Sequence, residues 1–271
     1  MANASFQSFS SINRPEEIGA ANCVTRADCY NAAVKIALMI TCLGDVLRPE
    51  VGQATVSLLR HLGHEVVFDP RQTCCGQPFY NSGFPDMARQ QAQYTIDVFQ
   101  HDLPVVTPSG SCAAMMKVEY PHLLEGDDLW HDKAKELAGR TFELSDFLVN
   151  QLKVVDVGAK YKGKVTYHFA CHLRGLGATD EAERLIQAVE GVTYLPLRLA
   201  DQCCGFGGSF SVRYPEISQA MVSDKVACIQ KTEADLVVST DAGCLMNIGG
   251  RSRRLNLPFQ VQHLAELLNR R

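Results

Sequence analysis

Eight of the eleven cysteines of this 271-residue chain fall into two sets with nearly the same spacing. The first set recurs 129 positions later for three of its members and 132 positions later for the fourth, so one three-residue insertion separates the copies. The first set comprises Cys42, Cys74, Cys75 and Cys112, and the second comprises Cys171, Cys203, Cys204 and Cys244. A repeat of this kind indicates an internal duplication in which each copy supplies four thiols.

Four thiols in each copy match the ligand number of a [4Fe-4S] cluster, which is held by four cysteine thiolates. The sequence therefore predicts two [4Fe-4S] clusters, with all eight cysteines as ligands. Zinc is an alternative because thiolates suit it equally, although structural zinc sites usually use short Cys-x-x-Cys turns, which are absent here. Buried, unligated cysteines are a second alternative. Disulfides are disfavoured because the number of cysteines is odd and two pairs are adjacent in sequence.

The elements that must position these thiols can be predicted from apolar runs and helix signals. We expect strands at 34–41, 65–68, 104–107, 165–169, 192–195 and 236–239, and helices at 50–62, 85–99, 180–189 and 215–231. Alternating strands and helices predict an α/β fold with two pseudo-symmetric modules and mainly parallel sheets. The cysteines follow expected strand ends, where functional groups gather in open α/β sheets. Gly76 and Gly205 can supply the sharp bend that lets two adjacent cysteines address one cluster.

The predicted organisation is an extension at 1–33, a first module at 34–158 and a second module at 159–271. The extension, which contains Cys23 and Cys29, lacks the apolar core of a secretory signal, and we expect a cytoplasmic protein. A formal charge of -4 without a basic run argues against nucleic acid as a partner. We also expect no membrane span, because no apolar run approaches the ~20 residues that one requires.

The two cysteine sets, with their neighbours, resemble the CCG-domain family, which includes the cysteine-rich component of heterodisulfide reductase and iron–sulfur subunits of glycolate and glycerol-3-phosphate oxidation. The resemblance covers the chain from about residue 34 to its end and is carried by Thr-Cys-Leu-Gly-Asp at 41–45, Cys-Cys-Gly-Gln-Pro at 74–78, Ser-Gly-Ser-Cys at 109–112 and Cys-Cys-Gly-Phe-Gly-Gly at 203–208. Within the family the chain is most similar to members of lactate-utilisation systems. The resemblance implies an iron–sulfur electron-transfer subunit of a multi-subunit L-lactate oxidation complex, working beside a ferredoxin-like iron–sulfur protein and a third protein.

Two departures limit what this resemblance carries over. The full family motif ends in Cys-x-x-Cys, whereas Ser109 and Asp241 stand at the first of those positions here. Each copy therefore lacks a fifth thiolate, which counts against the alternative of a cluster-dependent thiol–disulfide reductase. The chain also lacks a ferredoxin-type Cys-x-x-Cys-x-x-Cys run and any recognisable nucleotide loop, so electrons are expected to enter or leave through a partner. A zinc-stabilised binding module remains the other alternative.

Three other cysteines and two histidines are weaker candidates for metal ligands. Cys23, Cys29 and Cys228 are predicted not to be ligands. His168 and His172 flank Cys171 and could bind a metal, but histidines at such positions are more often neighbours of a site.

Overall fold

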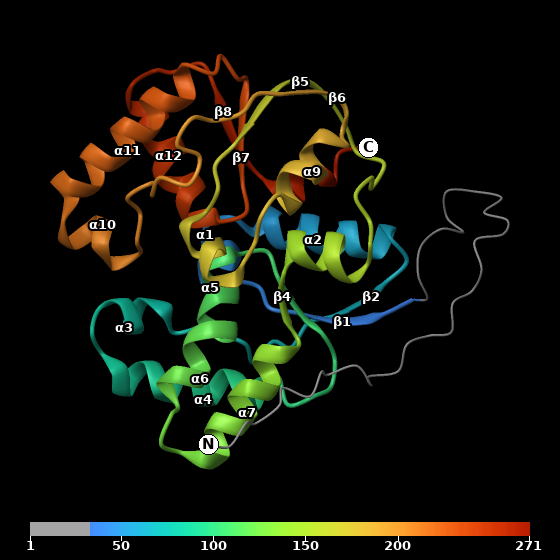
Figure 1. Ribbon diagram of the computed structural model, residues 1–271, viewed down its shortest axis with the longest axis vertical. Coiled ribbons are helices and arrows are strands. Elements are labelled where there is room, and N and C mark those ends of the chain that lie inside the picture. Colours follow the sequence, from blue (N-terminus) through green and yellow to red (C-terminus); the bar gives the residue numbers. More distant parts are fainter. Residues whose placement is uncertain (1–32) are drawn as a thin grey trace, which may run out of the picture.

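The structure is a computed structural model that describes residues 33–271 (Figure 1). The predicted extension, with Cys23 and Cys29, lies outside the described residues apart from residue 33. Among the residues that are described, no helix has the length and apolar character needed to cross a membrane.

Each half of the chain forms a four-stranded, wholly parallel sheet, with strand orders β2-β1-β3-β4 and β6-β5-β7-β8. The strands of the first sheet are β1 (Lys35–Leu38), β2 (Glu65–Val67), β3 (Val105–Thr107) and β4 (Thr141–Glu143). Those of the second are β5 (Lys160–Tyr167), β6 (Glu190–Tyr194), β7 (Leu236–Ser239) and β8 (Gln260–His263). The predicted fold class, α/β with two pseudo-symmetric parallel modules, is confirmed.

The helices connect successive strands in both halves and several begin with proline, whose fixed φ suits the first helical turn. The first half contains α1 (Cys42–Leu47), α2 (Pro49–His61), α3 (Gln77–Asn81), α4 (Pro85–Val98), α5 (Gly110–Ala114), the π-helical turn η2 (Met115–Glu119), α6 (Tyr120–Leu123), α7 (Asp128–Gly139), α8 (Leu144–Asp146) and the π-helical turn η3 (Phe147–Gln151). The second half contains the 3₁₀ helix η4 (Cys171–Leu176), α9 (Glu181–Gln187), α10 (Ser209–Arg213), α11 (Pro215–Gln230), α12 (Ala242–Arg254) and α13 (Leu264–Leu268). The order of elements after β1 and β5 is thus nearly repeated.

Several bounds and elements differ from the sequence prediction; for example, β5 begins at Lys160 rather than at residue 165, and α7 and α12 were not predicted. The first strand ends at Leu38 rather than at residue 41, and Cys42 instead opens α1. The last strand of each sheet was not predicted, because β4 and β8 contain a single apolar residue each, Phe142 and Val261, and so form no apolar run.

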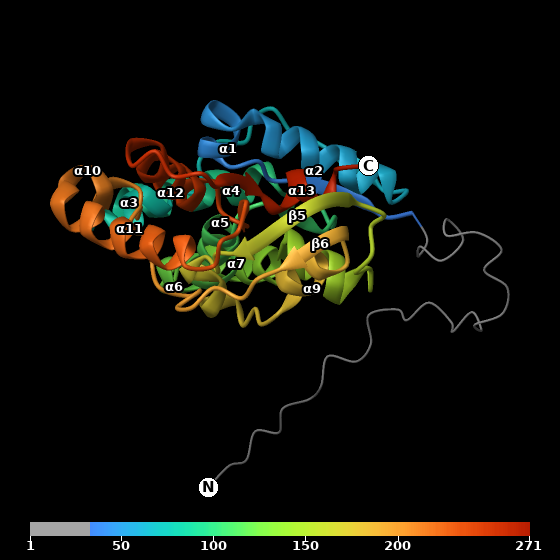
Figure 2. The same cartoon turned by 90° about the horizontal axis from the view of Figure 1, so that it is seen from above.

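The two modules share a hydrophobic core. Leu58 and Leu59 of α2 belong to the same buried cluster as Val165 of β5 and Leu264 and Leu267 of α13. Figure 2 shows α13 lying between α2 and β5. Two further clusters lie beneath the cysteines, one in each module. The modules therefore pack as one body, and their relative position is fixed by apolar burial.

Candidate metal-cluster site

All eight predicted cysteines line the same cavity, which has a volume of about 580 Å³ and is walled by both modules. The carboxyl ends of the two sheets bring them there, because each cysteine lies in the segment that follows β1, β2, β3, β5, β6 or β7. Cys228 lies in α11 and is not part of the wall. The structure thus joins into one chamber the two sets that the sequence presents as separate sites.

The four thiols of the first set form two close pairs. Cys42 Sγ lies 3.6 Å from Cys74 Sγ, and Cys75 Sγ lies 3.3 Å from Cys112 Sγ. Cys42 and Cys112 both lie in the first turn of a helix, α1 and α5, where the unpaired backbone N–H groups favour negative charge. These helix ends therefore suit a negatively charged group held by the two sulfurs, such as a thiolate-bound metal.

The second set repeats this arrangement with small changes. Cys171 opens η4, and Cys244 lies in the first turn of α12. Cys204 and Cys244 are the buried pair, as Cys75 and Cys112 are in the first set. His172, which also lines the cavity, places Nδ1 3.7 Å from Cys171 Sγ.

A left-handed glycine bends the chain after each double cysteine, as the sequence predicts. Gly76 has φ of 86° and Gly205 has φ of 79°, values that a side chain disfavours. Each glycine N–H then donates back to a sulfur, Gly76 to Cys74 Sγ at 3.4 Å and Gly205 to Cys203 Sγ at 3.3 Å. The bend therefore both aims the two thiols and supplies a backbone donor to one of them.

The thiols within each set share protons unequally. The pKa of Cys74 is lowered by hydrogen bonds from Cys42 and Cys75 and by the Gly76 N–H, whereas the pKa of Cys42 is raised, first by its hydrogen bond to Cys74 and then by burial. In the second set the pKa of Cys203 is lowered by the equivalent donors. Within each set, the thiol that accepts the glycine N–H is thus one whose thiolate form is favoured.

Ser109 and Asp241, which replace the family's additional cysteines, cap helices and join the modules. Ser109 Oγ accepts from the N–H of Cys112 at 3.3 Å and donates to Asp241 Oδ2 at 3.1 Å. Asp241 Oδ2 also accepts from the N–H of Ser111 at 3.1 Å, and its Oδ1 accepts from the N–H of Gly243 at 3.1 Å. Both carboxylate oxygens are therefore engaged, and Asp241 holds α5 of the first module against α12 of the second. Sequence reasoning missed this link, although Ser and Asp are preferred N-cap residues.

The donor set fits a thiolate-bound metal cluster. Four soft sulfur donors converge in each half, and the wall between them includes the apolar side chains of Leu47, Phe206 and Met246. His168 is also close to the second set, with a ring nitrogen and the Sγ atoms of Cys204 and Cys244 all within 4.8 Å of one another. The site residues can accordingly hold metal in an environment that partly excludes water.

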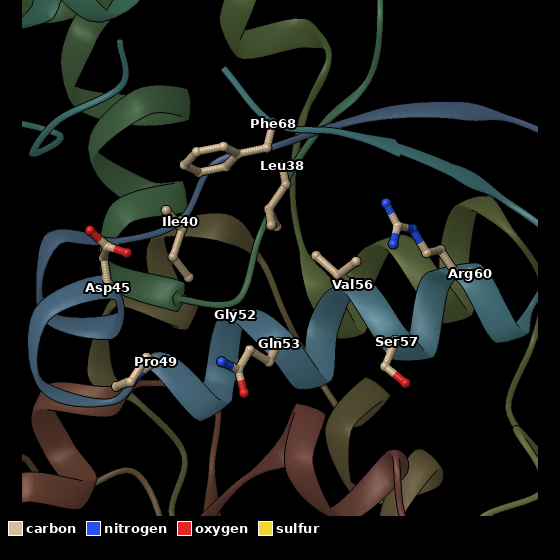
Figure 3. A pocket seen from close by; sticks show the side chains of 10 residues that line it. All are labelled: Leu38, Ile40, Asp45, Pro49, Gly52, Gln53, Val56, Ser57, Arg60 and Phe68. Atoms are coloured by element: carbon tan, nitrogen blue, oxygen red, sulfur yellow. The ribbon is translucent and has the colours of Figure 1, made fainter. Parts of the chain in front are cut away.

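A second cavity, of about 640 Å³, lies along α2 beside β1 and β2 (Figure 3). Its wall combines apolar side chains such as Ile40 and Phe68 with Asp45 and Arg60, and it contains no cysteine or histidine. Nothing in its lining provides ligands for a cluster.

Comparison with known proteins agrees with these features. The model of the cysteine-rich domain family CCG matches residues 36–117 and 165–249, which contain the two cysteine sets. The chain is 50% identical to "Lactate utilization protein A" of Bacillus licheniformis and 51% identical to that of Geobacillus kaustophilus, in each case over 88% of this chain and the whole of the relative.

Among solved structures, a hypothetical protein from Helicobacter pylori has the same fold, with a TM-score of 0.60 at 8% identity, over 88% of this chain and 49% of that one. The repeated cysteine sets, the paired parallel sheets and the curated relatives together show that this chain belongs to the CCG cysteine-rich domain family, alongside the proteins named lactate utilization protein A.

Proposed function

We propose that this chain is the iron–sulfur electron-transfer subunit of a multi-subunit system that oxidises L-lactate. The observation that carries the proposal is the convergence of two four-cysteine sets on one cavity. The relatives named for lactate utilisation, about half identical over their whole length, supply the substrate.

The proposed ligands are the four cysteines of each set, which would hold one [4Fe-4S] cluster apiece. Such a cluster, when bound, supplies one-electron transfer. The chain's own residues hold the thiolates in place: Gly76 and Gly205 orient the double cysteines, and Ser109 and Asp241 fix the helices that carry Cys112 and Cys244.

Partners are part of the proposal because the sequence carries no recognisable flavin, nicotinamide or ferredoxin motif. We infer a ferredoxin-like iron–sulfur protein and a third lactate-utilisation protein as partners. The isolated chain should then be nearly inactive, and the reconstituted system should support lactate-dependent reduction of an electron acceptor.

Metal analysis of anaerobically purified protein tests the cofactor. Two [4Fe-4S] clusters predict about eight irons and about eight acid-labile sulfides per chain. Zinc without sulfide would instead favour the binding module. Disulfide reduction by the isolated chain would favour the reductase.

Single cysteine variants test the ligand assignment. Cys75→Ala and Cys204→Ala should each remove about half of the iron, because each breaks a single four-thiolate set. Cys228→Ala is the matched control, since Cys228 lies outside the cavity wall, and it should leave the iron content unchanged. Equal iron loss from Cys228→Ala would contradict the assignment.

A further inference from the structure

The two cysteine sets differ at a buried position directly behind them. Met39 and His168 each lie three residues before the first cysteine of their set. Their backbones are equivalent, because the N–H of Met39 donates to the carbonyl of Val106 at 2.9 Å and that of His168 donates to Val238 at 2.8 Å. The duplication has therefore placed a thioether behind one set and an imidazole behind the other.

His168 is enclosed by protein. Its side chain is 0% exposed, and neither ring nitrogen makes a hydrogen bond of normal geometry, although the backbone carbonyl of Ala200 lies close to the ring. A buried polar group without a partner is costly, so such a group calls for an explanation. The polar atoms that face it include the sulfurs of Cys204 and Cys244, within 4.8 Å of a ring nitrogen.

The position of His168 distinguishes a donor from a ligand. All eight candidate cysteines line the cavity, whereas His168 does not. The imidazole is therefore buried behind the cavity wall and does not reach the cavity surface. The ring makes no hydrogen bond to either sulfur in the structure. A polar imidazole within 4.8 Å of both sulfurs can still stabilise added negative charge on them, and such a neighbour raises the reduction potential of a cluster.

A buried lysine is a second difference between the surroundings of the two cysteine sets. Residue eleven of α11 is Lys225, 0% exposed, whereas residue eleven of α4 is Thr95. Lys225 Nζ donates to the carbonyls of Leu199 and Ala200, in the loop that leads to Cys203. Its positive charge therefore lies near the second set, whereas Thr95 supplies no charge at the equivalent position of the first module.

Asp241 is the opposing charge in this neighbourhood. Its carboxylate accepts three hydrogen bonds, two of them from Ser109 and Ser111 of the first module, which disperse its charge. His168 and Lys225 are thus two buried features of the second set that the first set lacks, beside His172, whose Nδ1 lies 3.7 Å from Cys171 Sγ where the first set has Leu43.

We propose that His168 acts through the thiolates of Cys204 and Cys244 to make the second site the higher-potential member of the pair. This inference rests on the proposed function. With both clusters bound, an electron shared by the pair would rest on the second site, the first cluster losing one electron as the second gains one, with no bond or proton transferred.

Redox titration followed by electron paramagnetic resonance tests the proposal. Cys75→Ala protein isolates the second site, and Cys204→Ala protein isolates the first. In the Cys75→Ala background, His168→Leu should lower the equilibrium constant for one-electron reduction of the remaining cluster about tenfold. That change corresponds to a reduction potential lower by about 59 mV. His168→Asn, which retains an N–H donor, should recover most of that shift.

The matched control is Met39→Leu in the Cys204→Ala background. This variant should leave the reduction potential of the first site unchanged. Met39→His in the same background should raise it. An unmoved second potential in His168→Leu, a first site of higher potential than the second, or loss of iron from a folded His168→Leu protein would overturn the proposal. The absence of iron and sulfide from the unmodified protein would refute the proposed function itself.

Discussion

Replacing Gly205 with alanine tests whether the bend after the double cysteine is as constrained as its geometry indicates. Gly205 has φ of 79°, and a Cβ there would lie 2.8 Å from the carbonyl oxygen of Ser218 and 2.9 Å from Cβ of Met221. Both neighbours belong to α11, and the first is a backbone atom that cannot rotate away. The substitution must therefore displace the bend, the helix or both.

The loss in free energy of unfolding caused by Gly205→Ala has two contributions. A left-handed conformation costs a residue with a side chain about 1–2 kcal/mol, and overpacking of a buried site adds roughly 1–3 kcal/mol. Gly205→Ala should therefore lower the free energy of unfolding by about 2–5 kcal/mol, a large share of the ~5–15 kcal/mol of a typical domain. The second set should also lose its metal, because the bend orients Cys203 and Cys204.

Two other glycines provide graded controls. Gly76 occupies the same bend in the first module, but a Cβ there would meet the flexible side chain of Gln91 at 3.0 Å, with the nearest backbone atom at 3.7 Å. Gly63 has φ of 88° and open space around its Cβ position. We expect losses of roughly 1–3 kcal/mol for Gly76→Ala and about 1–2 kcal/mol for Gly63→Ala.

Urea unfolding of the reduced, metal-free proteins, followed by circular dichroism, measures the three losses. Iron analysis of anaerobically purified protein measures how much metal the second cysteine set loses in Gly205→Ala. The reasoning is refuted if Gly205→Ala unfolds at the same urea concentration as Gly63→Ala. Retention of full iron by Gly205→Ala would show that the bend is not needed to aim the thiols.

Two further predictions concern the junction between the modules. Asp241→Ala should lower the free energy of unfolding by about 2–4 kcal/mol, because it leaves the buried N–H groups of Ser111 and Gly243 without an acceptor, and a urea midpoint close to that of the unmodified protein would count against this role. His263 donates from Nε2 to the carbonyl of Pro108 at 3.1 Å, and burial lowers its pKa to about 4, so its contribution to stability is present above pH ~6.5 and is lost as the pH falls toward 4, by up to about 3 kcal/mol. His263→Asn removes this contribution, so the stability difference between the unmodified protein and the variant, from urea midpoints measured at pH 4 to 7, should increase with pH by up to about 3 kcal/mol. A difference that does not change with pH would exclude His263 as its cause. The comparison with the unmodified protein cancels the opposite contribution of Glu143, whose pKa burial raises to about 7.

The sequence predicts the chemistry of the candidate site better than its arrangement. Equal spacing identifies the eight cysteines because a duplication preserves sequence separations, and Gly76 and Gly205 are predictable because only glycine readily adopts the required bend. The alternation of apolar runs likewise predicts the parallel sheets. These features depend on local chemistry or on the order of elements along the chain.

What the sequence does not predict depends on contacts between distant segments. Periodicity identifies α13 as apolar but cannot show that Leu264 packs against α2 of the other module. The strands β4 and β8 each contain a single apolar residue, so they give no apolar run, and they are recognisable only through their pairing with β3 and β7. The partner of Asp241 is 132 residues away at Ser109. Its helix-capping role follows from residue type, but its link between modules does not.

The packing of the modules explains why two cysteine sets share one cavity. Gly110 lies so close to Leu173 of the other module that a Cβ would approach its side chain to 2.7 Å, and Ser82 Oγ lies 2.7 Å from Ser209 Oγ. These contacts and the common core hold the carboxyl ends of the two sheets face to face. Each module therefore supplies part of the wall around the other's thiols, and neither set keeps its environment if the modules separate. The repeat can then diverge at single buried positions, as Met39 and His168 have, without disturbing the shared frame.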